Sequence, residues 1–236
     1  MAASADAATG GERHGEVLLR PVRPEDLPAL EEVCLRTGDR GADASARTRF
    51  PALLGDVYAT PYAVHEARFA TVVEDGHGVG GYLLGCLDTA AFERWRERSW
   101  WPPLRERYPL PEQVADGFDT PLLRAVHSGV PEQPVWRTHP SHLHVDLLPR
   151  LQGRGLGGAL VRRLWVQLTA AGSPGVHLGV AAANPGAVRF YRRTGFTELS
   201  RDEGGYVFGR SLPAPPGADA AVAPEVTGRS GPAAAG

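Results

Sequence analysis

The stretch HVDLLPRLQGRGLGGALVRRL, residues 144 to 164, constrains the fold of this chain more than any other. An apolar run with strand character leads into four glycines, and an amphipathic run with helical spacing follows them. Glycine leaves backbone N–H groups uncovered, and the dipole at a helix N-terminus favours an anion there. We therefore expect a strand, a bare loop and a helix that together hold a phosphate ester, with arginines nearby.

Two common phosphate-binding motifs do not fit this stretch. Gly153, Gly155 and Gly158 satisfy G-x-G-x-x-G, but a dinucleotide site also needs an acidic residue about 20 positions later. No Asp or Glu occurs between Gly158 and Glu198. The phosphate loop of nucleotide hydrolases needs a lysine, and all 25 Lys and Arg residues of this chain are arginines.

Length and composition predict one globular domain with irregular ends. The 236 residues are 42% hydrophobic and carry a net charge of −2, which is unlike the basic footprint of a nucleic-acid-binding protein. Residues 1–15 and 213–236 are rich in Ala, Gly and Pro, so we expect both segments to be disordered around a domain at 16–212. No apolar run approaches the roughly 18 residues of a membrane span. We expect a cytoplasmic protein that is a monomer or homodimer.

Hydrophobic periodicity predicts an α/β fold. Strands are expected near 16–22 and 206–212, a helix over 24–37, and a hairpin over 69–89. Residues 89–140, rich in Trp and Pro, are expected to form an insertion with short helices. Strands then alternate with helices over 142–195, which implies a parallel βα unit.

Two motifs in this second half resemble the GCN5-related N-acetyltransferases. Residues 152–157, QGRGLG, are similar to the family's Q/R-x-x-G-x-G/A loop, and residues 184–196, NPGAVRFYRRTGF, to its second motif. The stretches CLRTGDRGAD, GGYLLGCLDTAAF and SWWPPLRERYP also resemble the acetyltransferase-like C-terminal domain of O-GlcNAcase and its stand-alone bacterial relatives. This resemblance implies a mixed, mostly antiparallel sheet of six to seven strands, flanked by helices and splayed where acetyl-CoA enters.

The resemblance also implies site residues. Tyr191 matches a family tyrosine that protonates the CoA thiolate, Asn184 matches an asparagine near the pantetheine arm, and the backbone of Val145 and Leu147 matches the strand that pairs with that arm. The full set of residues implied to bind acetyl-CoA, with CoA as product, is Val145, Leu147, Leu148, Gln152, Gly153, Arg154, Gly155, Leu156, Gly157, Gly158, Asn184, Ala187, Phe190 and Arg193.

The acceptor side is less defined by the sequence. We expect a small-molecule or peptide amine as acceptor, and Asp39, Asp43, Tyr62 and Trp100 as candidate pocket residues. His142, His144 and Asp146 share one face of their strand, which we expect to be covered by helices rather than to bind a metal. Three functions stay open: an N-acetyltransferase acting by direct attack, a catalytically silent acyl-CoA-binding module, and a substrate-recruiting domain that needs no CoA.

Overall fold

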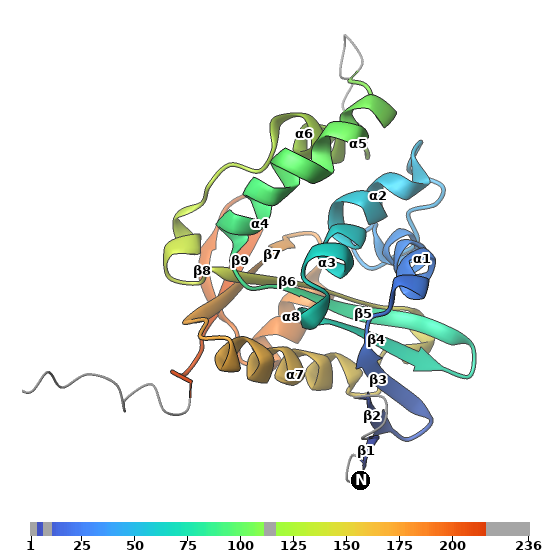
Figure 1. The fold of residues 1–236 in the computed structure, drawn as a ribbon, viewed down its shortest axis with the longest axis vertical. Coiled ribbons are helices and arrows are strands. Elements are labelled where there is room, and N and C mark those ends of the chain that lie inside the picture. Colours follow the sequence, from blue (N-terminus) through green and yellow to red (C-terminus); the bar gives the residue numbers. More distant parts are fainter. Residues whose placement is uncertain (1–3, 7–10, 111–116, 216–236) are drawn as a thin grey trace, which may run out of the picture.

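A single mixed sheet organises the molecule (Figure 1). The computed structural model describes residues 4–6, 11–110 and 117–215. The strand order is β1-β2-β3-β4-β5-β6-β7-β9-β8, and every neighbouring pair is antiparallel except β6 and β7. The strands are β1 (Ser4–Asp6), β2 (Gly11–His14), β3 (Val17–Pro21), β4 (Ala70–Asp75), β5 (Gly78–Cys86), β6 (Ser141–Leu147), β7 (Gly175–Ala181), β8 (Thr197–Arg201) and β9 (Gly205–Ser211).

Helices cover both faces of this sheet. Figure 1 shows α7 and α8 on one side, and α1 to α6 on the other. The helices are α1 (Leu27–Thr37), α2 (Pro51–Tyr58), α3 (Thr60–His65), α4 (Thr89–Trp95), α5 (Trp101–Arg107), α6 (Thr120–Ser128), α7 (Leu156–Ala170) and α8 (Pro185–Arg193). A π-helical turn, η3 (Arg96–Trp100), joins α4 to α5.

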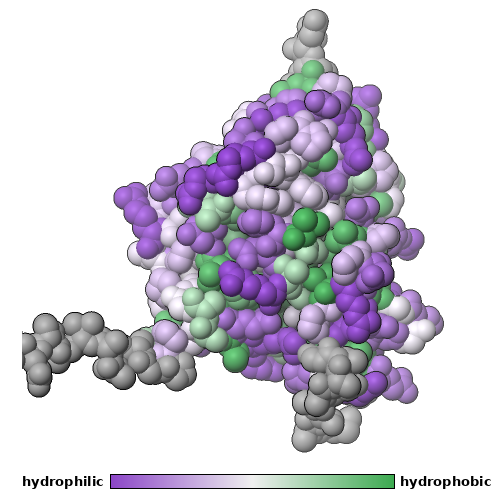
Figure 2. All heavy atoms as spheres, in the orientation of Figure 1, coloured by the Kyte–Doolittle hydropathy of each residue, from purple (hydrophilic) through white to green (hydrophobic). Residues whose placement is uncertain are grey.

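Each face of the sheet has its own apolar core, because side chains alternate along a strand. In β5, Tyr82, Leu84 and Cys86 pack with α1 to α6, whereas Leu83 packs with α7 and α8. The apolar stripe of α7, which includes Leu160 and Leu164, completes the second core. The outer surface is mainly hydrophilic: on the face seen in Figure 2, apolar residues form small patches.

The predicted α/β domain with a mostly antiparallel sheet is confirmed, but the sheet has nine strands rather than six or seven. The additional strands are β1, β2 and β8. All five side chains of β8 are exposed, so its sequence lacks the apolar alternation that signals a strand. β1 and β2 lie within residues 1–15, for which we expected no order. Of the tail expected to be disordered, residues 216–236 lie outside the described residues.

The segment between β5 and β6, which we expected to be an insertion, contains helices. Between β5 and β6 the chain forms α4, η3, α5 and α6, followed by a short 3-10 turn, η4 (Pro134–Arg137). Residues 111–116 of this segment lie outside the described part. No helix among the described residues is long and apolar enough to cross a membrane.

The sheet opens between β6 and β7, the parallel pair. These strands are paired only at Ser141 with Val176 and at His142 with His177. On its other edge, β6 stays paired with β5 as far as Leu147. The later half of β6 therefore has one edge without a neighbouring strand.

Candidate functional site

A pocket of about 890 Å³ lies at this opening. The end of β6, the glycine loop, and α8 form one side of it, and residues of α1 and α2 form the other. The pocket is therefore lined by helices from both faces of the sheet.

The glycine loop presents an open backbone surface to this pocket. Gly153 and Gly155 have φ angles of 71° and 77°, in the left-handed region that favours glycine. Gly155 is the N-cap of α7, and a Cβ added at either glycine would meet no atom within 4 Å. The Gln152 amide donates to the Leu147 carbonyl at 2.8 Å and ties the loop to the end of β6. With no acidic residue in the first turn of α7, this geometry suits an anion.

Helix α8 supplies the second predicted motif to the same pocket. Asn184 caps this helix, since its Oδ1 accepts from the Ala187 N–H at 3.0 Å. The Tyr191 ring is buried and packs against Phe190 and Phe196 at centroid distances of 5.0 and 5.5 Å. Burial raises the pKa of Tyr191 well above its usual value. The phenol is thus in its protonated form at neutral pH and can donate a proton.

The other side of the pocket carries polar residues of β6. Asp146 and His144 both line it. The Tyr82 hydroxyl donates to Asp146 at 2.9 Å, and Asp146 forms no salt bridge within the described residues. Burial raises the pKa of Asp146, although the hydrogen bond from Tyr82 opposes this shift. An uncompensated carboxylate here favours a cationic ligand.

Most residues implied to bind acetyl-CoA lie together at this pocket. Those that line it are Val145, Leu147, Gln152, Gly153, Gly155, Leu156, Gly157, Gly158, Asn184, Ala187, Phe190 and Arg193, together with Tyr191. Two others do not. The Leu148 side chain packs against the core under α1 to α6, and Arg154, between two loop glycines, is exposed.

None of the four residues expected at the acceptor pocket lines it. Asp39 pairs with Arg47 at 2.8 Å, and Asp43 accepts from the Ser45 N–H at 2.8 Å in an exposed turn. The Trp100 indole donates to the Asp56 carbonyl at 2.8 Å. Tyr62 is fully packed behind His144. A position in the N-terminal half of the sequence does not reveal which side chains point into the pocket, which explains the difference from the expected set.

The structure instead places residues there that sequence reasoning left out. Beside His144 and Asp146, the lining includes Thr37 of α1 and Tyr58 of α2. The sequence contained a signal for His144 and Asp146. With His142 they place three polar residues on a strand face covered by helices, and burying polar groups is costly unless they have partners or a function.

The His142, His144 and Asp146 pattern does not converge on a common point. Nε2 of both histidines faces the Tyr62 hydroxyl, whereas Asp146 faces Tyr82. Within the part of the chain that the structure describes, no group of three or more His, Cys, Asp or Glu residues is arranged to hold a metal ion.

Comparison with known proteins agrees with this geometry. The family model "Acetyltransferase (GNAT) family" matches residues 128–196. The crystal structure of SsHAT superposes with a TM-score of 0.77 at 35% sequence identity, covering 84% of this chain and 98% of that one. The GCN5-like protein acetyltransferase Rv2170 of Mycobacterium tuberculosis is 34% identical over 143 residues, which is 53% of this chain and 66% of the relative.

The predicted resemblance to O-GlcNAcase is also confirmed. Protein O-GlcNAcase of Rattus norvegicus is 24% identical over 201 residues, or 82% of this chain. The chain spans 22% of that relative's length. Together, the matched motifs, the shared fold and the 35% identity to SsHAT establish that this chain belongs to the GNAT family of acetyltransferases.

Proposed function

We propose that this protein transfers an acetyl group from acetyl-CoA to an amine by direct attack of the amine. The observation that carries the proposal is the single pocket in which the open glycine loop, the free edge of β6 and the Tyr191 side chain meet. An anion cradle and a proton donor in one cavity are what a CoA thioester donor requires.

The residues present fit acetyl-CoA. Its pyrophosphate would lie on the N–H groups of residues 153–158, where the open space at Gly153 and Gly155 leaves room for phosphate oxygens. The backbone of Val145 and Leu147 would pair with the pantetheine arm along the edge of β6 that β7 leaves free. The donor supplies an activated acetyl thioester when bound.

The acceptor is proposed to be an amine of a small molecule or peptide, bound on the α1 and α2 side of the pocket. The carboxylate of Asp146 supports a cationic group there, because no salt bridge within the described residues compensates its charge. Tyr191, on the opposite side, would give its proton to the departing thiolate. The proposed division therefore places the donor beside α8 and the acceptor beside α1.

Two variants of one residue test the loop. Gly155→Ala and Gly155→Glu both impose an L-residue on a left-handed conformation, so both should lower stability by about 1–2 kcal/mol. Only Glu adds a negative charge beside the proposed phosphates. We expect Gly155→Glu to bind acetyl-CoA at least about 100-fold more weakly by calorimetry, because like charges in contact cost several kcal/mol. Gly155→Ala should stay within about tenfold of the native chain.

Native affinity in Gly155→Glu would contradict the loop assignment. Turnover is tested separately, by detecting free thiol across a panel of amines. Tight binding of acetyl-CoA without any turnover would favour the silent acyl-CoA-binding module. Absence of binding by the native chain would favour the recruiting domain that needs no CoA.

A further inference from the structure

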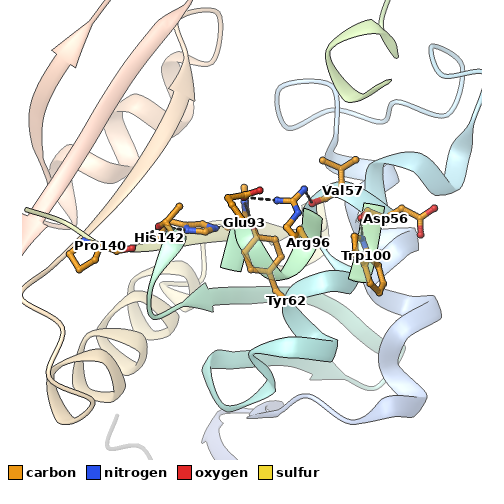
Figure 3. A network of polar contacts seen from close by, with 10 residues as sticks. Asp56, Val57, Tyr62, Glu93, Arg96, Trp100, Pro140 and His142 are labelled. Atoms are coloured by element: carbon orange, nitrogen blue, oxygen red, sulfur yellow. Dashed lines mark hydrogen bonds and ion pairs between the residues drawn. The ribbon is translucent and has the colours of Figure 1, made fainter. Parts of the chain in front are cut away.

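A chain of hydrogen bonds runs behind the acceptor side of the pocket and ends at His144. It begins where the Thr89 hydroxyl meets the Pro140 carbonyl at 2.6 Å. Thr89 Oγ1 also lies 2.8 Å from His142 Nδ1, and His142 Nε2 lies 2.8 Å from the Tyr62 hydroxyl. That hydroxyl lies 3.0 Å from His144 Nε2. Figure 3 shows the Pro140, His142 and Tyr62 part of this chain.

Counting protons fixes the direction of every bond in this chain. A carbonyl can only accept, so the single Thr89 hydroxyl proton goes to Pro140. His142 Nδ1 must then donate to Thr89. In a neutral imidazole the other nitrogen is an acceptor, so His142 Nε2 accepts the single proton of Tyr62. Tyr62 can therefore only accept from His144, whose Nε2 carries the proton.

Both imidazoles are neutral in this environment. Burial lowers the pKa of His142 well below its usual value, and His144 and His177 act in the same direction. Burial lowers the pKa of His144 to about 4, with the Arg96 cation as the next cause. Arg96 is buried beside Tyr62, held by Glu93 at 3.0 Å and the Val57 carbonyl at 3.3 Å (Figure 3). A second positive charge in this region is unfavourable.

This series of hydrogen bonds leaves one nitrogen free. His144 Nδ1 has no hydrogen-bond partner among the described residues, and it is not fully buried, since it is absent from the buried polar atoms that lack a partner. Since His144 lines the pocket, this lone pair is open to the cavity. Two residues along the same strand face is Asp146, which lines the same cavity.

From this geometry we propose that His144 Nδ1 accepts the proton of the attacking amine, and that Thr89, His142 and Tyr62 are positioning residues that fix its tautomer. The proposal rests on the proposed function. The bound ammonium first releases one proton to solvent and becomes the free amine. As the C–N bond forms and the C–S bond breaks, the amine nitrogen becomes acidic and its second proton moves to His144 Nδ1. The thiolate takes its proton from Tyr191. Before the next turnover His144 releases its proton to solvent, and the Tyr191 phenolate takes one up from solvent.

Asp146 has a different role in this arrangement. Its carboxylate attracts the cationic acceptor and stabilises the transient imidazolium of His144. The neutral imidazole of His144 provides the lone pair that takes up the proton. Loss of Asp146 should therefore act mainly on KM for the amine, and loss of His144 mainly on kcat.

The tautomers can be tested without any substrate. Long-range proton–nitrogen NMR on protein labelled with ¹⁵N-histidine distinguishes the two tautomers, and the signals are assigned from His142→Gln and His144→Gln. We expect opposite tautomers two residues apart, with the proton on Nδ1 in His142 and on Nε2 in His144. The same tautomer at both positions, or the reverse pair, overturns the positioning chain.

Kinetics test the proton transfer. His144→Gln keeps an N–H that can reach Tyr62 but has no basic nitrogen. We expect unchanged affinity for acetyl-CoA and a fall in kcat of about 10²–10⁴-fold, the usual contribution of a general base. His77→Gln, in the exposed turn between β4 and β5, is the matched control and should have native kcat. Asp146→Asn should raise KM for the amine more than it lowers kcat.

Two further variants keep the test sharp. Tyr62→Phe retains the ring and removes the link, so kcat should fall about fivefold, the equivalent of one net hydrogen bond. His144→Ala should regain turnover when imidazole is added, which a purely structural role would not produce. Native kcat in His144→Gln overturns the proton-acceptor role alone. Absence of turnover by the native protein on every amine overturns the proposed function, and that role with it, while the NMR result still decides the tautomers.

Discussion

The polar residues on one face of β6 differ in what their side chains contact. His142 is buried and exchanges hydrogen bonds with Thr89 and Tyr62, so it costs little despite its polarity. His144 shares the Tyr62 partner but keeps one nitrogen open to the pocket. His142 thus supports the structure, whereas His144 faces the pocket. The alternation of side chains along a strand does not by itself distinguish these two roles.

Tyr191 gives a prediction at the same scale. Its ring packs among Phe190, Phe196 and Phe208, whereas its hydroxyl has no hydrogen-bond partner among the described residues. Tyr191→Phe should therefore leave the fold and the affinity for acetyl-CoA nearly unchanged. If the phenol protonates the thiolate, turnover should fall by about tenfold or more. The measurement is kcat with an identified acceptor, beside a calorimetric Kd, and an unaltered kcat would remove Tyr191 from the mechanism.

At the scale of elements, the strand, loop and helix around the pocket could be predicted, because their signals are local. The β6 to α8 region has continuous apolar periodicity with glycine at its boundaries, and each element lies where the pattern indicates. The positions of α2 and α3 could not be predicted in this way. Their residues gain helical structure by packing Leu53, Val57 and Tyr62 into the core against α1 and β5, which are distant in sequence.

The acceptor side shows the same limit for the site. The glycine loop and Tyr191 belong to motifs whose spacing fixes their placement within one βα unit. Thr37 and Tyr58 reach the pocket only because α1 and α2 pack over β5 and β6. Such contacts depend on tertiary packing, so no local pattern distinguishes them from Asp39 and Asp43, which lie outside.

The close pairing of β5 with β6 supports the pocket and can be tested. A Cβ added at Gly81 would lie 2.9 Å from the Asp146 carbonyl oxygen and still closer to the Leu147 side chain. Because backbone must move to relieve this contact, Gly81→Ala should destabilise the fold by about 1–3 kcal/mol. It should also weaken acetyl-CoA binding, since Leu147 anchors the glycine loop through Gln152. Denaturant unfolding and calorimetry measure the two effects.

Gly76→Ala is the control for that experiment. Gly76 lies in the turn between β4 and β5, where an added Cβ would meet no atom within 4 Å. Stability and affinity close to native are expected for it. If Gly81→Ala behaves in the same way, then the β5 to β6 contact does not hold the end of β6 in place.

For the whole molecule, the two cores meet at a sheet whose centre contains several neutral histidines. Burial lowers the pKa of His142, His144 and His177, which come from β6 and β7. Tyr58 of α2, Tyr62 of α3, Arg96 of η3 and His139 lie against these histidines, and Cys86 of β5 and Glu93 of α4 lie near Tyr62. The folded protein therefore favours the uncharged form of these three imidazoles. Because the unfolded chain does not, the free energy of unfolding depends on pH.

The sign of that dependence follows from proton linkage. Below the ordinary histidine pKa of 6.5 the unfolded chain binds protons that the folded chain does not, so the free energy of unfolding falls as pH falls. Each buried histidine contributes a slope of up to about 1.4 kcal/mol per pH unit between 6.5 and its folded pKa. Asp146 and Glu93 act in the opposite direction, because burial raises their pKa values and the folded state holds their protons more tightly.

We therefore expect stability to be highest above pH 6.5 and to decline as pH is lowered toward 5. His142→Gln isolates one contribution: it removes one titrating group and leaves the opposing carboxylates unchanged. Its slope should be smaller than native by an amount that rises toward about 1.4 kcal/mol per pH unit, the value for one proton, as pH falls from 6.5 to 5. Unfolding in urea at several pH values measures both slopes. The exposed variant His77→Gln should keep the native slope. An equal slope in His142→Gln would mean that folding does not lower the pKa of His142, so the neutral form used in the proton count for His144 would not hold across this interval.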